Sequence, residues 1–374
     1  MYSTSNLESY VSHQTRMKYF AGKISWLMAT SLFVLVSLSA GCNFIKTEKK
    51  TPTLLKTENA EQSDLMKEIN RFARVNSMRA KMDLRFEDNS FAELGMKEAY
   101  RGAPGEVVVQ RPAMILLKVQ APIIGSDIAQ MTSDGQTFRV AILQDGGSGK
   151  YKKFVKGTND ADYSKLQKAI STTEAIDSKT AKQNVNAFAN LRPQHFTDAM
   201  LVRPTSDNYI YTQSTIFQIE EDLTVDKKSP LRSVMRGYYL LDEYSRQDNG
   251  FMKIERRFWF DRVASIRLAK QQIFDAKGEV ESDIVYGKEG NLTDTGNYAN
   301  LPLEILVTRP KEKYSMKLSY QTPETVTIGN VFPVTAFILQ NTWNLEEVDL
   351  DKKLHEAGLD QQPAANKVTV TKYH

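Results

Sequence analysis

Apolar and polar residues alternate in short runs over much of the chain, which is the pattern of half-buried β-strands. The alternation is densest between Gly105 and Val140, where four runs are separated by Arg111-Pro112, by Pro122 to Gly125 and by Asp134-Gly135. Proline suits a strand edge or corner, and Asp-Gly suits a tight hairpin turn. Runs that lie this close together predict sequential strands that pair as an antiparallel meander.

Further alternating runs begin near Tyr209 and continue to residues 334–340. With an earlier run from Arg79 to Glu87 and the meander, they give about eleven predicted strands. A meander of this size has to curl so that its edges are protected. The pattern therefore predicts a mainly β fold with some α-helix, in which a curved, incomplete antiparallel β-barrel is covered by a helical lid.

Three stretches show a helical pattern instead. Ser63 can cap a helix from Asp64 to about Met78. The apolar stripe of this helix consists of Leu65, Ile69, Phe72 and Val75. Residues 157–200 lose the alternation and predict a helical insert, and residues 345–374 predict a short helix followed by a polar tail. The barrel itself is expected to span residues 63–344.

The N-terminal part of the chain has the features of a targeting segment. Lys18 and Lys23 flank the start of an apolar run over residues 24–38, which is too short and too rich in serine for a good membrane span. A positive segment before an apolar run is typical of a secretory signal. Residues 1–41 are therefore predicted to be a signal peptide, with 17–41 as the true signal because Met17 suits the start better.

The apolar run ends in Leu38-Ser39-Ala40-Gly41-Cys42, which resembles the bacterial lipobox. Ser39 is a departure, because an aliphatic residue is more usual there. The resemblance implies a lipidated Cys42, followed by a flexible tether over residues 42–62. Because Asn43 replaces the aspartate that retains such proteins at the inner membrane in enteric bacteria, an outer-membrane anchor is expected. An ordinary signal peptide with a chance cysteine is the alternative.

Composition and charge narrow the possible partners. The 374 residues are 25% charged and 41% apolar, as in ordinary globular proteins. The net charge of +4 comes from lysines and arginines spread along the chain, so no basic face for nucleic acid is expected. Cys42 is the single cysteine, which excludes an internal disulfide. The four histidines are scattered, so neither a metal nor another cofactor is expected.

Catalytic chemistry finds little support in the sequence. His195 stands alone beside Pro193 and Phe196, where histidine is more often structural than a base. Residues 146–150 (GGSGK) resemble a phosphate-binding loop, but the first glycine is not at the required distance and Tyr151 replaces the Ser or Thr that magnesium needs. No catalytic residue and no enzymatic activity are predicted.

Four different short sequence motifs follow one another along the chain. They are Arg111-Pro112 before an apolar strand, Met131 to Phe138 (MTSDGQTF), Phe258-Trp259-Phe260-Asp261, and Gln272 to Asp275 with Gly278. Their order and spacing resemble the LolA/LolB lipoprotein-carrier superfamily over most of residues 63–340. The resemblance implies a helix and a curved, incomplete barrel, with a helical lid over an apolar cavity that takes acyl chains.

The resemblance also implies roles for two corners of the meander. The arginine of the Arg-Pro pair is linked to lid closure in the periplasmic carrier, so Arg111 is a candidate latch. A projecting loop aids cargo transfer in the membrane-anchored receptor, so Ile123 or Ile124 is a candidate transfer tip. The alternatives are a solvent-facing or salt-bridged Arg111, and a buried turn at Ile123 and Ile124.

The alternation of apolar and polar residues indicates which side chains would line the cavity. They are Met82, Leu84, Phe86, Ile115, Leu117, Val119, Phe138, Val140, Ile142, Met316 and Leu318. A broad apolar sheet face has to be covered either by helices or by ligand. Helices at residues 64–78 and 180–200 that fill this face as an ordinary core are the alternative to a ligand cavity.

The sequence thus predicts a lipoprotein anchored in the outer membrane and facing the periplasm. It would bind the acyl chains of a lipoprotein or lipid for trafficking at the cell envelope, with a periplasmic carrier protein as a candidate partner. The alternative is a scaffold or interaction lipoprotein, in envelope assembly or stress sensing, whose core is filled by its own helices.

Overall fold

The structure is a computed structural model that describes residues 51–88, 98–122, 125–144, 149, 152–161, 163, 166 and 193–359. The predicted signal peptide, Cys42, Ile123 and Ile124, most of the helical insert and the polar tail lie outside these residues. The chain divides into two compact units. One comprises Met1–Thr53 and Glu221–Ser233, and the other comprises Leu54–Glu220 and Val234–His374.

The described elements are mainly strands. The strands are β1 (Thr53–Leu54), β2 (Ser77–Asp88), β3 (Glu98–Gln110), β4 (Met114–Gln120), β5 (Asp127–Ser133), β6 (Thr137–Ile142), β7 (Lys153–Thr158), β8 (Ile210–Glu221), β9 (Ser233–Arg246), β10 (Met252–Asp261), β11 (Arg267–Phe274), β12 (Val280–Leu292), β13 (Tyr298–Arg309), β14 (Tyr314–Tyr320), β15 (Thr327–Ile328) and β16 (Glu346–Asp349). The helices are α2 (Gln62–Phe72), α5 (Gln194–Met200) and α6 (Leu350–Glu356), with 3-10 turns η2 (Pro230–Arg232), η3 (Pro323–Thr325) and η4 (Val334–Phe337).

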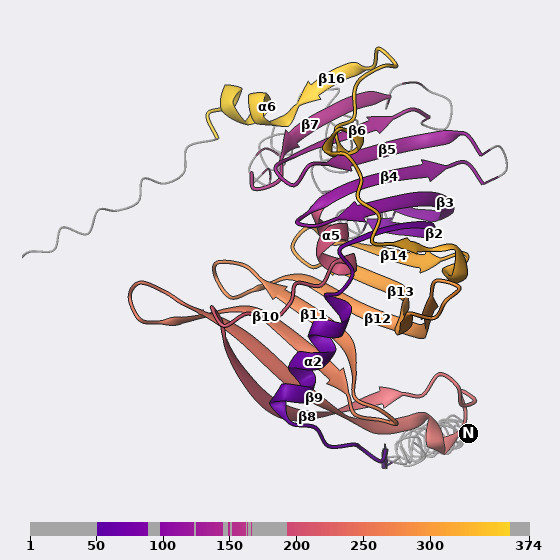
Figure 1. The fold of residues 1–374 in the computed structure, drawn as a ribbon, viewed down its shortest axis with the longest axis vertical. Coiled ribbons are helices and arrows are strands. Elements are labelled where there is room, and N and C mark those ends of the chain that lie inside the picture. Colours follow the sequence, from indigo (N-terminus) through magenta and orange to yellow (C-terminus); the bar gives the residue numbers. More distant parts are fainter. Residues whose placement is uncertain are drawn as a thin grey trace, which may run out of the picture. The chain divides into compact units, whose positions relative to one another are not determined.

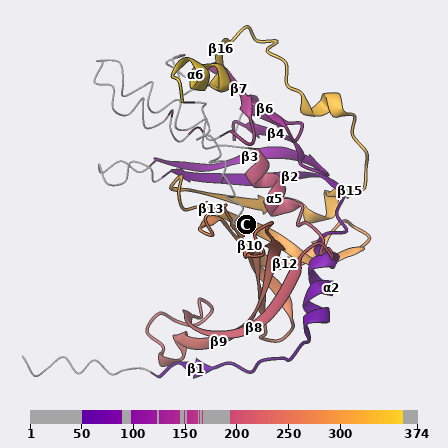
Figure 2. The same cartoon turned by 90° about the vertical axis from the view of Figure 1, so that its left-hand side faces the viewer.

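The strands of the described part form one sheet in the order β1-β9-β10-β11-β12-β13-β14-β2-β3-β4-β5-β6-β7-β16, with β15 beside β2 and β8 beside β9. Neighbours from β9 to β7 run antiparallel, whereas β16 pairs with β7 in parallel. Within the described residues no pairing joins the two ends of this order, so the curved sheet stays open (Figures 1 and 2). The predicted mainly β, incomplete barrel is thus confirmed in part. The sheet has sixteen strands rather than about eleven.

The register sets one apolar face of the sheet, which we call the inner face. Met316 of β14 lies opposite Phe86 of β2 and Val307 of β13. On the other side of β2, Ile115 and Leu117 of β4 follow the same alternation. Since successive side chains of a strand point to opposite faces, this period of two brings residues from twelve of the described strands into one buried cluster.

Helix α2 packs on the inner face through Leu65, Ile69 and Phe72, which are all buried. A capping box between Glu61 and Asp64 fixes its start. The helix ends at Phe72 rather than near Met78, and this part of the prediction was wrong. The apolar stripe continues to Val75, but Val75 packs into the core after the helix has ended, and β2 begins at Ser77.

Helix α5 begins just after Pro193, at the end of the predicted helical insert. It contacts β3, β4 and β13, and its Phe196, Ala199 and Met200 belong to the inner-face cluster. The described parts of α2 and α5 therefore cover the same apolar face (Figure 1). A complete helical lid is not established by these two helices.

The strand predicted at residues 334–340 is wrong. Residues Val334–Phe337 form the 3-10 turn η4, and Phe337 is fully buried against Val108 and Met114 on the face opposite the inner one. The backbone of Phe332 pairs with the side chain of Gln110, which fixes this segment on the sheet. Apolar residues that pack on the outside of a sheet show the same alternation as a strand. The predicted helix at residues 345–357 likewise starts later, because β16 comes first.

The described part of the smaller unit is mostly the turn after β8. The amide of Asp222 donates to the carbonyl of Arg232 at 2.8 Å, and the Arg232 guanidinium forms an ion pair with Glu221 at 2.9 Å. Leu223 and Leu231 are exposed in this turn. Residues Glu220, Glu221 and Asp222, which the acidic pattern placed in a solvated turn, end β8 and begin this turn.

Candidate functional site

The eleven side chains predicted to line a cavity all lie on the inner face. Eight are buried, and Phe86, Val119 and Ile142 are partly buried against the same cluster. The cluster also contains apolar residues of α2 and α5, so protein side chains cover these positions in this conformation. Whether acyl chains bind there stays a prediction.

One small pocket opens near this face, beside Phe72, Tyr286 and Arg267, with a volume of about 80 Å³. Sites that bury small ligands are typically about 300–1,000 Å³. This pocket is too small for an acyl chain. An acyl chain that bound where α2 and α5 pack on the inner face would have to displace these helices.

Arg111 holds the ends of both covering helices. Its guanidinium donates to the carbonyl oxygens of Ala73 at 3.2 Å and Val75 at 3.1 Å, which follow α2. It also donates to those of Leu201 at 3.4 Å and Val202 at 2.8 Å, which follow α5. Burial lowers the pKa of Arg111 below its usual value. The side chain is thus partly buried and bonds the backbone that follows both helices, and its role as a latch stays a prediction.

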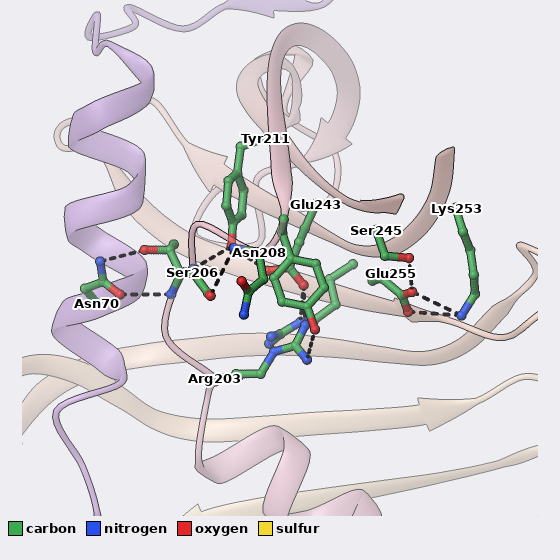
Figure 3. A network of polar contacts seen from close by, with 12 residues as sticks. Asn70, Arg203, Ser206, Asn208, Tyr211, Glu243, Ser245, Lys253 and Glu255 are labelled. Atoms are coloured by element: carbon green, nitrogen blue, oxygen red, sulfur yellow. Dashed lines mark hydrogen bonds and ion pairs between the residues drawn. The ribbon is translucent and has the colours of Figure 1, made fainter. Parts of the chain in front are cut away.

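The segment of residues 201–206, which we call the clasp, leads from α5 towards β8 and has no regular secondary structure. Thr205 exchanges two hydrogen bonds with Asn70 of α2, at 2.8 and 3.0 Å. The amide of Ser206 donates to the hydroxyl of Tyr211 on β8 at 3.1 Å. Arg203 pairs with Glu243 on β9 (Figure 3). The clasp therefore ties α2 and the end of α5 to the edge of the sheet.

Glu243 is the centre of the polar contacts at the clasp. One carboxylate oxygen accepts from Arg203 and, at 3.1 Å, from Nε of Arg256, and the other accepts from the hydroxyl of Tyr211 at 2.8 Å. The residue is 1% exposed. Burial raises its pKa, against the opposing effects of Arg203 and Tyr211. Burial also raises the pKa of the Tyr211 hydroxyl.

The sequence interpretation missed Glu243, Arg203 and Tyr211. One signal was present: in β9, Tyr239, Leu241 and Glu243 occupy alternate positions, so the acid falls on the buried side of an apolar strand. Buried carboxylates are rarely left without partners. A glutamate in that register points to a cationic partner from a distant part of the chain.

A second polar group lies beneath α5. His195 is buried, and its Nδ1 shares a hydrogen bond with the hydroxyl of Tyr314. Asp198, one turn further along, has its pKa raised to about 6 by burial, an effect that nearby Arg309 and Arg203 partly offset. Both side chains pack against the sheet and make α5 a partly polar cover.

Other predicted features cannot be placed. Cys42, Ile123 and Ile124 lie outside the described residues. In the part of the chain that is described, no group of three or more potential ligand residues is arranged to hold a metal ion. The described helices include none with the length and apolar character needed to cross a membrane.

Comparison with known proteins gives structural likenesses only. No family model matches the chain, and no curated protein matches it in sequence. The chain is similar to a LolA superfamily protein from Nitrosomonas europaea, with 10% identity over 75% of this chain and 99% of that one, and a TM-score of 0.37. It is also similar to a putative outer membrane lipoprotein-sorting protein domain from Vibrio parahaemolyticus, with 11% identity, 72% and 93% coverage and a TM-score of 0.36.

A third likeness is to a DUF1329 family protein from Desulfovibrio piger, with 10% identity over 74% of this chain and 95% of that one, and a TM-score of 0.35. The LolA superfamily, which the sequence motifs resemble, is thus named among these structures. The TM-scores correspond to a loose overlap, so we base the functional interpretation on this chain's own contacts.

Proposed function

We propose that the protein binds acyl chains of a lipid or lipoprotein between the inner face of the sheet and the helices α2 and α5. The observation that supports this most directly is the set of four backbone carbonyls around Arg111. One side chain fastens both covering elements at their ends. Loss of that one group would weaken the hold on both helices at once.

Such a latch can open because its contacts are individually modest. A hydrogen bond from a charged donor contributes about 1.5–3 kcal/mol net. The partly buried guanidinium regains water when it leaves the carbonyls, which offsets part of the loss. Acyl burial in turn gains about 0.8 kcal/mol for each CH₂ group. The four bonds of Arg111 amount to about 6–12 kcal/mol before rehydration. Burial of about fifteen CH₂ groups gains about 12 kcal/mol and offsets the release of the latch, so binding needs no covalent chemistry.

The cellular setting in this proposal comes from the N-terminal sequence. Cys42 would carry the acyl groups that anchor the protein to the outer membrane, with the folded part facing the periplasm and the tether between them. Anchoring through several acyl chains is stable, whereas one chain gives only marginal binding. A periplasmic carrier protein is the expected donor of the cargo.

The latch can be tested with Arg111→Leu. We expect this variant to take up a fluorescent fatty acid about tenfold faster than the wild type, because the covering helices separate from the sheet more often. Arg79→Leu is the matched control, since Arg79 is an exposed arginine on β2 that pairs only with Glu106 of β3. Equal uptake rates for the two variants would contradict the latch, and no uptake by the wild type would contradict acyl binding.

The second candidate function is a scaffold or interaction lipoprotein without cargo. The complete burial of Met82, Ile115 and Phe138, each at 0% exposed, favours this reading because the inner face is already filled. Mass spectrometry of the purified protein separates the two functions. Co-purified lipid supports the carrier, and a lipid-free protein that also refuses the fatty acid supports the scaffold.

A further inference from the structure

Glu243 differs from the other acidic residues near the clasp in how deeply it is buried and in what it holds. It lies on β9, yet its strongest partner, Arg203, belongs to the clasp forty residues earlier in the chain. Its neighbour Glu255 on β10 is more exposed and is held by Lys253 at 3.1 Å and by Ser245 at 2.6 Å (Figure 3). Of these two carboxylates, only that of Glu243 contacts the clasp.

The contacts of the clasp form a chain that ends on α2. Arg203 is fixed to Glu243, and two residues later Thr205 is bonded to Asn70 in the last turn of α2. The next residue, Ser206, binds Tyr211, whose hydroxyl itself donates to Glu243. Arg203 therefore bonds Glu243 directly and Ser206 reaches it through Tyr211, whereas Leu201 and Val202 at the start of the clasp are held by Arg111.

We propose that Glu243 is a second, pH-sensitive latch, which holds the clasp and thereby α2 on the sheet while it is ionised and releases them when it is protonated. The inference rests on the proposed opening of the helices for acyl binding. It adds a regulator to that opening, one that acts from β9 and is separate from Arg111.

The charges around Glu243 set the direction of the response. The charged and titratable groups that face it are Arg203 from the clasp, Tyr211 from β8, Arg256 from β10 and, at longer range, Glu255. The two arginines favour the ionised form, whereas burial and Glu255 favour the protonated form. Burial is the larger effect and raises the pKa. Acidification therefore protonates Glu243 earlier than an exposed glutamate and weakens its bonds to Arg203.

Through Glu243, acidification has opposite effects on the global stability of the protein and on the attachment of the clasp. With a native pKa above the unfolded one, the folded protein binds more protons than the unfolded chain in the window between the two values. The contribution of Glu243 to stability is therefore present at low pH and lost as the pH rises through the native pKa. For the clasp, the comparison is between Glu243 with and without Arg203. Arg203 lowers the pKa of Glu243 while the clasp is bound, so release of the clasp from the still buried carboxylate raises that pKa further, and protonation favours the released clasp.

Hydrogen exchange of the full chain without ligand tests the proposal. Glu243→Gln keeps the shape of the side chain but removes its charge, and we expect exchange in residues 201–206 to become about tenfold faster. Glu255→Gln is the matched control and should leave these amides unchanged. Lowering the pH from about 7.5 to about 5 should speed exchange in the wild type, after correction for the intrinsic rate, but not in Glu243→Gln.

A second variant tests the proposal even if Glu243→Gln does not fold. Arg203→Gln, at a half-exposed position, removes the same ion pair from the other side and should give the same acceleration. The double variant should exchange no faster than either single one, because one interaction is lost in all three. Unchanged exchange in both single variants, or a wild type that is insensitive to pH, would overturn the proposal.

Fatty acid uptake separates this proposal from the proposed function. Faster uptake by Glu243→Gln than by Glu255→Gln would support both. Absence of uptake by every protein, including the wild type, together with accelerated exchange, would refute acyl binding and leave the latch in place. Equal uptake and equal exchange in the two variants would refute the latch alone.

Discussion

Shortening Ile69 to alanine weakens the hold of α2 on the inner face without touching Arg111 or Glu243. Ile69 is 0% exposed and packs in the same cluster as the predicted cavity lining. The substitution removes three carbon atoms, worth roughly 2.4 kcal/mol of burial at about 0.8 kcal/mol each. The cavity left behind adds to this, so a loss of about 3 kcal/mol is expected, within the usual range of about 2–5 kcal/mol.

This loss has a specific consequence if an acyl chain binds where α2 now packs. The closed conformation is destabilised, whereas the open, acyl-bound conformation has already given up the Ile69 contacts. Apparent affinity rises with the fraction of protein that is binding-competent. At about 1.4 kcal/mol for each factor of ten, 3 kcal/mol corresponds to an increase of roughly a hundredfold as the upper limit.

The assay is titration with a fluorescent fatty acid, paired with urea unfolding of each protein. Met114→Ala is the control, because Met114 is also buried but lies on the opposite face with Phe337. Both variants should be less stable than the wild type, and only Ile69→Ala should bind the fatty acid more tightly. Refutation would be an Ile69→Ala protein that loses stability as expected but binds the fatty acid no more tightly than Met114→Ala.

Two further predictions concern α5 and the anchor. Burial raises the pKa of Asp198 from 3.8 to about 6, so its contribution to stability is present below about pH 4 and is lost as the pH rises through 6. In urea unfolding, Asp198→Asn should therefore be more stable than the wild type at pH 8, by up to about 3 kcal/mol, and only slightly more stable at pH 4. A gain in stability that does not depend on pH would contradict this. Cys42→Ser should shift the protein from the membrane to the soluble fraction in cell fractionation, and unchanged membrane association would exclude lipidation at Cys42.

The two latches act at the same ends of the cover through different contacts. Arg111 bonds the backbone directly after α2 and after α5, whereas Glu243 acts on Arg203 of the clasp, which continues from α5 and reaches the last turn of α2. Opening requires both sets of contacts to break. The order in which they break would decide whether cargo or pH starts the opening.

Local alternation by itself determined the strands and the face that each residue occupies. All eleven side chains assigned to the inner face lie there. Side-chain direction in a strand depends only on the period of two along the backbone. No knowledge of distant partners is needed for that step.

The tertiary structure decided whether an apolar segment forms a strand, a helix or a turn, which the alternation alone does not distinguish. Val334 to Phe337 alternate like a strand but form a 3-10 turn, because an outer sheet face was available for Phe337 to cover. The apolar stripe of α2 extends to Val75 although the helix does not, since the core accepts Val75 from a non-helical backbone.

The polar site is the clearest case of a feature that only the fold creates. The motif pointed to Arg111, but its carbonyl partners lie 36 to 91 residues away and are ordinary backbone groups with no sequence signature. In the sequence, Glu243 can be recognised as an acid on the buried face of a strand. Its pairing with Arg203 follows only from the position of the clasp in the fold. The sequence alone thus determined the apolar surface, and the packing of the two helices decided which polar groups hold it closed.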